Sequence, residues 1–472
     1  TQPSNGTATI TILDNNGDTI DRIPQGTAKP SQISDSTLVT ATIKLTIAST
    51  SSSSVDLSGI TITINQFIPQ IYDYFTFKVN DDNQTVTLTD YDSSLLGSTD
   101  VVIPSTVSQN SSGEWIEGNT YTVTAIASAS SYSNGVFYNS GITSIELPST
   151  LQSIGNYAFY RCSGITGELN LGGCTSLTSI GSNAFYSCSG LKGELNLGGC
   201  TSLTSIGNFA FRDCSGLTSI SLPSSLKAIG GVAFDGCSGL TGELNLGGCT
   251  SLISIGGSAF SGCSGLTGEL NLGECTSLTS IGGSAFYYCS GLTSITLPEG
   301  ITSIGNSAFE GCSGLKGELN LGGFARLTSI GSSAFYDCDG LTGLTLPSSI
   351  TSIGSQAFDS TNINVVNYNG TLSDWLKVSI ETVGANSWIV THRFIINGEE
   401  LINLEVPEGV ESINDGLFSY CSGLKSVTLP STLKTIGKKA FRDCSGLTSV
   451  DLSGCTSLTS IGNSAFYYCS GL

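Results

Sequence analysis

Histidine and methionine are almost missing from this sequence. One histidine, His392, occurs in 472 residues, and methionine does not occur at all. A Ser-His-Asp triad takes its base from a histidine, so only His392 is available for one. Neither a nucleophile elbow nor a phosphate-binding loop is present. We therefore expect a protein without enzymatic activity and without a cofactor, in which His392 packs beside Arg393 rather than serving as a ligand.

Charge, and positive charge above all, is also scarce. Charged residues are 11% of the chain, and 37 acidic side chains outnumber 17 basic ones, which leaves a net charge of −20. Nucleic acid and anionic lipid both bind through Lys and Arg, so neither is an expected partner. No apolar run reaches the roughly 18 residues of a membrane-spanning helix, and we expect no transmembrane segment.

A 23-residue unit recurs through most of the chain. Its clearest copy covers residues 292–314 and reads LTSITLPEGITSIGNSAFEGCSG. Residues 292–297 have the spacing of a short strand, which Pro298 ends because proline cannot donate to a strand ladder. Isoleucines at 301 and 304 form a second apolar edge, and residues 308–312 suggest one helical or 3₁₀ turn. One such unit cannot bury its own apolar side, so the units must stack on one another.

The copies of this unit can be counted by their phenylalanine. Successive phenylalanines lie mostly 23 or 26 residues apart, with one interval of 60 that marks an insertion. The 13 positions are Phe137, Phe159, Phe185, Phe211, Phe234, Phe260, Phe286, Phe309, Phe335, Phe358, Phe418, Phe441 and Phe466. With a rise of about 4.8 Å per coil, the stack should span on the order of 60 Å.

The consensus LxxIxLPxxLxxIGxxAFxxCxG closely resembles the BspA-type leucine-rich repeat, over roughly residues 121–472 apart from the insertion. The resemblance implies a right-handed leucine-rich-repeat solenoid of short parallel β-strands with turns and short 3₁₀ or α segments. It also implies a secreted or surface-anchored protein. Such proteins are common in bacteria that live with animal hosts, and some members adhere to host matrix proteins or to other microbes.

The presence or absence of the repeat motif divides the chain into five segments. Residues 1–66 lack it and alternate like β-strands, so we expect a small β-sandwich-like N-terminal domain. Residues 67–120 contain a β-hairpin pattern and are expected to cap the solenoid. The repeats occupy residues 121–360 and resume over 401–472. Residues 361–400 resemble an insertion of the same family, in which a short helix and a hairpin pack on the solenoid.

Sixteen cysteines raise the question of disulfides, and their placement argues against them. Eleven stand three residues after the motif phenylalanine, one per coil, so neighbours should lie about 4.8 Å apart. Parallel side chains keep their Cβ atoms near that separation, beyond the roughly 3.8 Å that a disulfide prefers. Zinc sites of CxxC pairs and histidines are absent. We expect an unbridged core ladder of small buried hydrophobes, which includes Cys162, Cys188, Cys214, Cys237, Cys263, Cys289 and Cys312.

The 26-residue units contain an additional Gly-Glu-Leu-Asn-Leu-Gly-Gly segment. Its leucines should point inward and its glutamate and asparagine outward. Carboxylates on consecutive coils repel each other. Two interpretations remain: a solvated polar face copied by duplication, or a strip that binds cations or a basic partner. The residues of this candidate surface-binding strip, hereafter the Glu–Asn strip, are Glu168, Glu194, Glu243, Glu269, Glu318, Asn170, Asn196, Asn245 and Asn271.

Tyrosines follow the motif phenylalanine in several units. A row of amphipathic rings can form a contact surface, or it can shield the turn beside it. These tyrosines are Tyr138, Tyr160, Tyr186, Tyr287, Tyr288, Tyr336, Tyr467 and Tyr468.

We expect an extracellular or cell-surface adhesion scaffold that engages protein ligands through contacts repeated along its length. The resemblance indicates host matrix proteins or other microbial cells as these ligands. The alternatives are a passive stalk or surface coat, and a calcium- or sugar-binding module that uses the strand glutamates. The chain starts at Thr1 without methionine and stops within a unit at Leu472. We therefore expect a secreted or cell-surface piece whose export and anchoring signals lie outside it.

Overall fold

The computed structural model describes residues 74–93, 99–109, 119–381 and 393–472, together with the backbone of three strands nearer the N-terminus. These strands form an antiparallel sheet in the order β2-β1-β3. They are β1 (Ala8–Leu13), β2 (Thr19–Arg22) and β3 (Thr42–Ile47). The region before the solenoid thus contains a β-sheet, while its sandwich form and its extent over residues 1–66 stay predictions.

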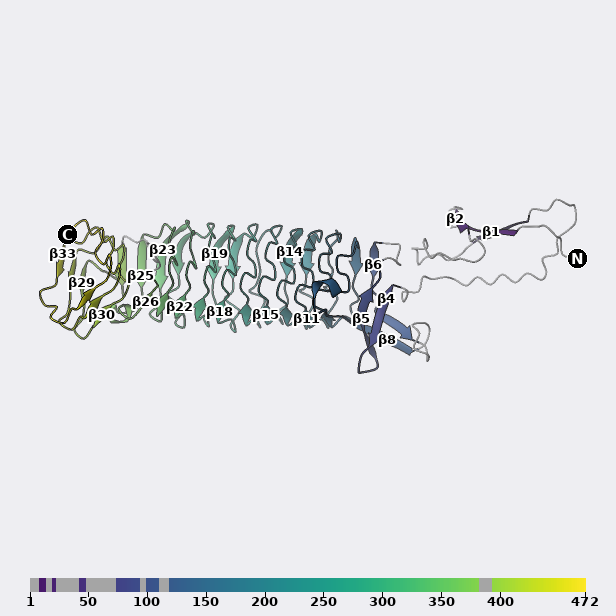
Figure 1. Cartoon of the computed structure of the whole chain (residues 1–472), viewed down its shortest axis with the longest axis horizontal. Coiled ribbons are helices and arrows are strands. Elements are labelled where there is room, and N and C mark those ends of the chain that lie inside the picture. The colour runs from purple at the N-terminus through teal and green to yellow at the C-terminus, as the bar shows by residue number, and fades with distance from the viewer. Residues whose placement is uncertain are drawn as a thin grey trace, which may run out of the picture.

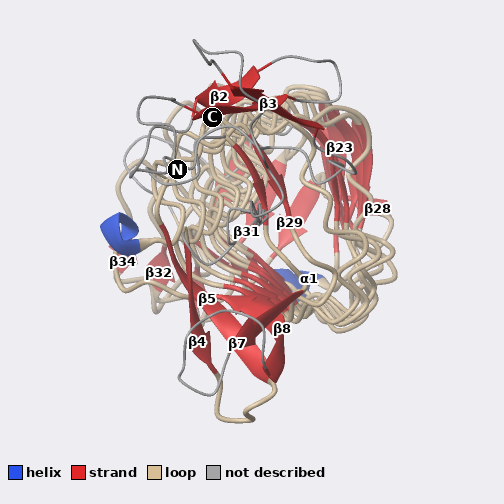
Figure 2. Ribbon diagram, turned by 90° about the vertical axis from the view of Figure 1, so that its right-hand side faces the viewer, coloured by secondary structure: helices blue, strands red, loops and turns tan. Residues whose placement is uncertain are grey.

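From residue 119 the chain winds into an elongated rod of stacked coils, seen from the side in Figure 1 and along its length in Figure 2. Nearly every strand pairs in parallel with the equivalent strand of the next coil. Helix is almost absent: the described residues contain one α-helix, α1 (Leu372–Trp375), and one short 3₁₀ helix (Tyr132–Asn134). The predicted leucine-rich-repeat solenoid is confirmed.

One side of the rod carries a continuous sheet of 14 strands. Ten of them are two-residue strands, one per coil, in which the isoleucine is buried and the preceding residue is half-buried or exposed. Isoleucine pairs with isoleucine at every step of this ladder, and serine pairs with serine or alanine at every step except β16–β18. These ten are β10 (Ser153–Ile154), β11 (Ser179–Ile180), β13 (Ser205–Ile206), β15 (Ala228–Ile229), β16 (Ser254–Ile255), β18 (Ser280–Ile281), β20 (Ser303–Ile304), β22 (Ser329–Ile330), β24 (Ser352–Ile353) and β26 (Ser379–Ile380).

The opposite side carries short, separate sheets instead of one continuous sheet. Their orders are β6-β9, β12-β14, β17-β19 and β21-β23-β25-β27-β28. The strands are β6 (Asp100–Val102), β9 (Ser144–Glu146), β12 (Gly193–Asn196), β14 (Leu217–Ser221), β17 (Gly268–Asn271), β19 (Leu292–Thr296), β21 (Gly317–Asn320), β23 (Leu341–Leu346), β25 (Val365–Tyr368), β27 (Arg393–Ile396) and β28 (Glu399–Glu400).

The last coils repeat the same two-sided plan in sheets of their own, with the orders β29-β31-β33 and β30-β32-β34. Their strands are β29 (Asn403–Glu405), β30 (Ser412–Ile413), β31 (Ser426–Thr428), β32 (Thr435–Ile436), β33 (Ser449–Asp451) and β34 (Ser460–Ile461).

The motif phenylalanines form a stacked column in the core. Ring centroids of neighbouring coils lie 4.7–5.5 Å apart, and the ring planes deviate by 3–13°. These distances agree with the spacing of about 4.8 Å expected between parallel strands. Because 12 of the 13 rings are wholly buried, this column, with the leucines and isoleucines around it, forms one core along the rod.

A hairpin covers the first ring of this column. Strands β4 (Phe75–Val79) and β5 (Thr85–Tyr91) pair antiparallel, as the sequence predicts, and β5 joins β8 (Asn119–Ile126), which also pairs with β7 (Thr106–Gln109). Phe75 and Tyr91 lie 6.4 and 4.9 Å from Phe137 between ring centroids. The apolar end of the column is therefore covered at this side.

The segment around the motif phenylalanine is a series of turns, which corrects the expected helical turn at residues 308–312. Three hydrogen bonds in succession close three turns: Ala308 N–H to Gly305 O, Glu310 N–H to Ser307 O, and Cys312 N–H to Phe309 O. Ser307 (φ 54°) and Gly311 (φ 72°) are left-handed, a conformation that a helix excludes. The N–H groups of residues 307, 309 and 311 instead donate to carbonyls of the next coil at 2.8 Å.

Part of the expected insertion continues both sides of the rod. Strand β25 pairs with β23, and β26 pairs with β24, both in parallel. The short helix α1 lies between them and is capped by Thr371, whose hydroxyl accepts from Asp374 N–H at 3.2 Å. Trp375 is wholly buried against Tyr368 and Phe394. A helix and the β27–β28 hairpin are thus present, while the extent of the insertion over 361–400 stays a prediction.

Candidate functional site

The Glu–Asn strip lies on the side of the rod with the short sheets. All nine side chains are exposed, and the leucines between them are buried. Asn170 and Asn196 form a parallel bridge between consecutive coils. The strip is therefore a row of polar side chains, repeated at the coil spacing, that solvent or a ligand can reach.

Two glycines of the strip, Gly193 and Gly268, make room for the glutamate side chain of the coil before them. Gly193 (φ 77°) and Gly268 (φ 80°) are left-handed. A Cβ atom on Gly193 would lie 2.8 Å from Glu168 Cγ, and one on Gly268 would lie 2.7 Å from Glu243 Cγ. Glycine is required here both for the backbone conformation and for this close approach.

Shorter coils separate the carboxylates into small groups. In register, Glu194 pairs with Ser219 and Glu269 with Ser294, so a neutral residue follows each pair of glutamates. Glu269 Oε1 also accepts a hydrogen bond from the hydroxyl of Thr296. Glu318 Oε1 likewise accepts from Thr345. The repulsion expected from stacked carboxylates is thereby limited to pairs.

Asparagine side chains of the strip face solvent and also accept hydrogen bonds from the backbone. Asn196 Oδ1 accepts from the N–H of Gly198 at 3.2 Å and from the hydroxyl of Ser221 at 3.1 Å. Asn170 and Asn271 accept from the N–H two residues on in the same way. The side-chain oxygen therefore fixes the turn after the strand. The sequence pattern could have indicated this role, because Asn commonly bonds the backbone two residues on.

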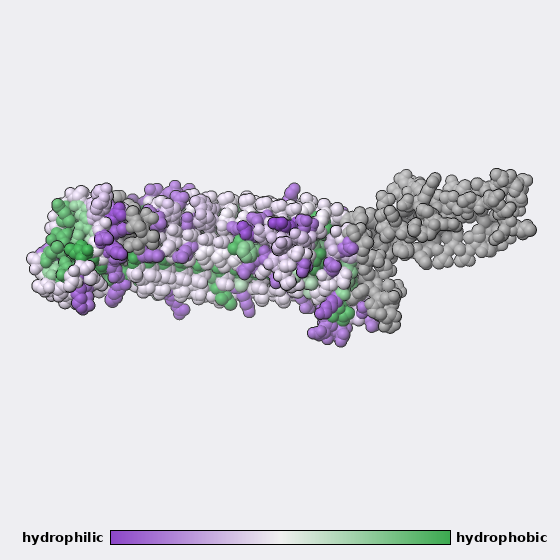
Figure 3. Space-filling view, viewed as in Figure 1, coloured by the Kyte–Doolittle hydropathy of each residue, from purple (hydrophilic) through white to green (hydrophobic). Residues whose placement is uncertain are grey.

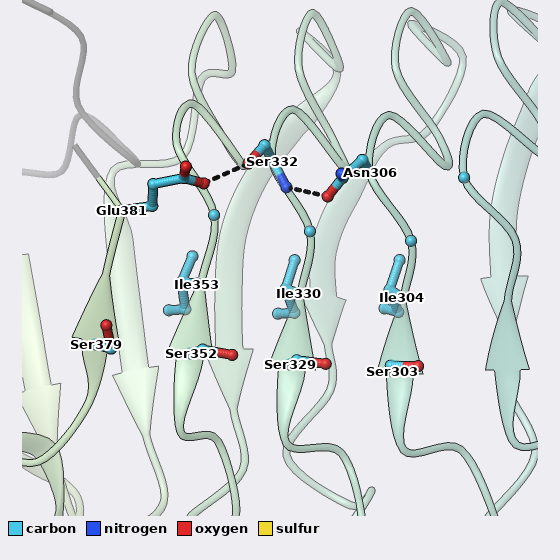
Figure 4. A pocket seen from close by; sticks show the side chains of 14 residues that line it. Ser303, Ile304, Asn306, Ser329, Ile330, Ser332, Ser352, Ile353, Ser379 and Glu381 are labelled. Atoms are coloured by element: carbon cyan, nitrogen blue, oxygen red, sulfur yellow. Dashed lines mark hydrogen bonds between the residues drawn. The ribbon is translucent and has the colours of Figure 1, made fainter. Parts of the chain in front are cut away.

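A polar groove crosses the coils of β20, β22, β24 and β26 on the continuous sheet (Figure 4). Its volume is about 540 Å³. Figure 4 shows three rows along it: serines, buried isoleucines, and a polar row in which Glu381 Oε2 accepts from Ser332 Oγ at 2.7 Å and Asn306 Oδ1 accepts from Ser332 N–H at 2.9 Å. The serines are Ser303, Ser329, Ser352 and Ser379.

Sequence reasoning missed this groove. Its wall joins Ser332 to Glu381, 49 residues further along the chain. A single unit contains nothing that brings these residues together. The groove offers hydroxyls, an amide and one carboxylate, groups that suit a polar ligand.

The tyrosines near the N-terminal end of the rod cover one another. Tyr160 lies 4.7 Å from Tyr186 and 6.1 Å from Tyr138 between ring centroids. The guanidinium of Arg161 lies 5.6 Å above Tyr160, and that of Arg212 lies 5.7 Å above Tyr186. Burial raises the pKa of Tyr160. Because ring faces are occupied by other rings and by arginines, the arrangement favours the shielding interpretation for these three tyrosines.

The seven core cysteines are wholly buried free thiols. Burial raises the pKa of the thiols of Cys214, Cys237 and Cys263. These three thiols therefore stay protonated near neutral pH in the folded chain.

The surface of the rod is mostly of neutral hydropathy, with polar groups scattered along it (Figure 3). Its C-terminal end is apolar in the same view. Near the C-terminus, Leu452, Ile461 and Leu472 are 41%, 50% and 57% exposed. The equivalent Leu429 and Ile436 of the preceding coil are buried. This end shows the face with which each coil packs on the next.

Two further classes of site have no support in the described part of the chain. No group of three or more His, Cys, Asp or Glu side chains there could hold a metal ion. No helix there has the length and apolar character needed to cross a membrane. His392 lies outside the described residues.

A comparison with known protein families agrees with this architecture. A family model described as BspA type leucine rich repeat region matches residues 130–267, 196–316, 271–379 and 392–472. A solved leucine-rich repeat protein from Bacteroides ovatus is 23% identical, over 85% of this chain and 92% of that chain, with a TM-score of 0.47. A leucine rich cell surface protein from Faecalibacterium prausnitzii is 22% identical, over 83% and 93%, with a TM-score of 0.33. No curated protein matches. The chain belongs to the family of BspA-type leucine-rich repeat proteins.

Proposed function

We propose that this chain is an extracellular or cell-surface scaffold that binds proteins through contacts repeated along the rod. Its membership of the BspA-type family supports a protein-binding role. We further propose host matrix proteins or other microbial cells as the ligands. We propose no catalytic role for the chain, because its coils are nearly uniform and the groove beside Glu381 offers a single carboxylate and no histidine.

The observation that carries the proposal is the Glu–Asn strip. Parallel pairing holds the strip side chains of neighbouring longer coils one coil apart, a shorter coil separates each pair from the next, and the core column beneath keeps the spacing regular. A single exposed carboxylate binds a basic partner weakly. Several weak contacts on one rigid body act together, because after the first contact the others form at a high effective concentration. A basic, repetitive partner surface therefore suits this strip.

Binding to a panel of immobilised host matrix proteins tests the proposal. The triple variant Glu194→Gln, Glu243→Gln, Glu269→Gln should weaken binding at least tenfold and reduce its salt dependence, because it removes charges that attract the partner. The matched control is Glu274→Gln, Glu299→Gln, Asp339→Asn, which removes three exposed carboxylates outside the strip. Equal affinity of both variants and the parent chain would reject the strip as the binding surface.

A passive stalk is the other function that such a rod could serve. Deleting pairs of whole coils distinguishes the two, because avidity depends on the number of contacts and a stalk depends only on length. Binding that falls in steps with coil number supports the scaffold. Adhesion that is unchanged while its reach shortens supports the stalk.

A further inference from the structure

The motif cysteines make a contact that their apolar character does not require. In ten coils the Sγ–H donates to the carbonyl oxygen of the motif phenylalanine in the preceding coil, at 2.8–3.2 Å. The donors are Cys162, Cys188, Cys214, Cys237, Cys263, Cys289, Cys312, Cys338, Cys444 and Cys469. Each coil is thus joined to its neighbour through the core as well as through the strands.

The eleventh motif cysteine provides an internal comparison. Cys421 belongs to the first phenylalanine unit after the interval of 60 residues, so no phenylalanine unit directly precedes it in the array. It is also buried, at 5% exposure, but within the described residues its thiol has no such acceptor. The same side chain therefore occurs in the same turn with and without the contact.

The two units that lack this cysteine still supply a hydrogen-bond donor. Ser140 and Thr361 occupy the position. Thr361 Oγ1 donates to Phe358 O of its own coil at 2.8 Å, and Ser140 Oγ lies 3.5 Å from Cys162 Sγ. A site that required only a small apolar side chain would accept alanine or valine, and neither occurs in any of the 13 units.

Three of the five cysteines of the longer coils, Cys174, Cys200 and Cys275, make the same kind of contact on the other side of the rod. Cys200 Sγ donates to Leu171 O at 3.1 Å, and Cys275 Sγ donates to Leu246 O at 3.3 Å. In both cases the acceptor belongs to the preceding coil. The contact is therefore not peculiar to one turn.

The chemistry of the acceptor explains why a thiol suits the site. Phe185 O already accepts the N–H of Cys188 within its own coil at 3.2 Å, so the thiol of Cys214 meets its second lone pair. A hydroxyl would be the stronger donor but would bury lone pairs of its own that need partners. A thiol donates weakly and loses little when it leaves water.

We propose that the motif cysteines act as hydrogen-bond donors that tie each coil to the phenylalanine carbonyl of the coil before it. The thiol hydrogen, and not only the apolar volume, is the property that the position requires. This inference concerns the array itself and is independent of the proposed function.

Serine and alanine variants at two cysteines test the proposal in the full chain. At Cys214, serine keeps a donor and alanine removes it, so C214S should melt about 2 °C above C214A. At Cys421, where the described residues offer no acceptor, the order should reverse, because a buried hydroxyl without a partner is destabilising. If alanine melts above serine at both sites, the cysteines act as hydrophobes alone and the proposal is wrong.

The S–H stretching band of the unmodified protein provides a readout that needs no variant. Hydrogen-bonded thiols absorb at lower frequency than free ones. Most of the S–H band of the folded chain should lie at lower frequency than the S–H band of the unfolded chain in an apolar cosolvent. The variant C421A should remove intensity at the frequency of a thiol without a hydrogen bond. A folded-state band wholly at the free-thiol position would overturn the proposal.

Discussion

The two halves of each coil differ in length variation: one half has the same length in the shorter and the longer coils, and the other contains the additional residues. The constant half runs from the two-residue strand through the phenylalanine turns to the next leucine. It has 13 residues from Ala228 to Leu240 and the same number from Ser254 to Leu266. The variable half runs from that leucine to the next two-residue strand, and the three additional residues of the 26-residue coils all lie there.

This difference explains why one sheet is continuous and the others are short. The constant half places equivalent residues at equivalent positions in every coil, so its two-residue strands pair without a break from β10 to β26. In the variable half the strands change length and shift register at the inserted glycine. The constant half therefore sets the stacking. The variable half can differ from coil to coil, and it carries the Glu–Asn strip.

Removing a core ring from the constant half should have the largest effect. Phe260→Ala leaves a cavity between two stacked rings and should lower the free energy of unfolding by about 3–5 kcal/mol, measured by urea denaturation. Ile253→Ala, in the variable half and 52% exposed, should change it by less than about 0.5 kcal/mol. Equal losses of unfolding free energy in the two variants would contradict the division of each coil into a constant and a variable half.

Two glycines provide a smaller but closely matched contrast. A Cβ on Gly256, in the constant half, would lie 2.4 Å from the backbone nitrogen of Gly231, so Gly256→Ala should destabilise the chain by about 1–3 kcal/mol. A Cβ on Gly248, in the variable half, has no atom within 4 Å, so Gly248→Ala should be nearly neutral. Thermal melts of the two variants measure the difference. A fall in melting temperature for Gly248→Ala as large as that for Gly256→Ala would contradict the division of the coil into two halves.

The pH dependence of stability reports on the buried thiols of the constant half. Burial raises the pKa of Cys421 to about 12 and also raises the pKa of Cys237 and Cys263. Unfolded thiols ionise near pH 8.5. Above that pH the unfolded chain therefore loses protons that the folded chain keeps. Stability is fully present below about pH 8.5 and falls as the pH rises, by about 1.4 kcal/mol per pH unit for each thiol.

Urea midpoints measured at about pH 7.5 and about pH 10 test this prediction. The variant Cys263→Ala removes one buried thiol and should show a smaller difference between the two midpoints. Midpoints that agree at both pH values would mean that the thiols ionise equally in the folded and unfolded chains.

Much of the fold could be predicted from sequence because the length of the repeated unit and its apolar positions are visible in the sequence itself. The strand expected over 292–297 is β19, and the phenylalanine spacing gave the number of coils. The turns after Ile304 could not be predicted, because Ser307 adopts a left-handed conformation that non-glycine residues rarely favour. An N–H group bonded to the next coil offsets that strain, and a single unit contains no sign of this partner.

The candidate site divides in the same way. The outward glutamates and asparagines follow from strand alternation within one segment. The groove beside Glu381 and the thiol donors depend on atoms 25–49 residues apart in sequence. The groove and the thiol hydrogen bonds, which join specific atoms of different coils, were not predicted, whereas the outward direction of the glutamates and asparagines was.

A coil conversion tests the central claim most directly. Residues 242–251 of a longer coil would be replaced by the seven-residue sequence of 219–225, which turns its variable half into that of a shorter coil. The account predicts a melting temperature within about 3 °C of the parent chain, because the constant half and its ladder are untouched. A chain that unfolds, or that melts as low as Phe260→Ala, would show that the two halves are not independent.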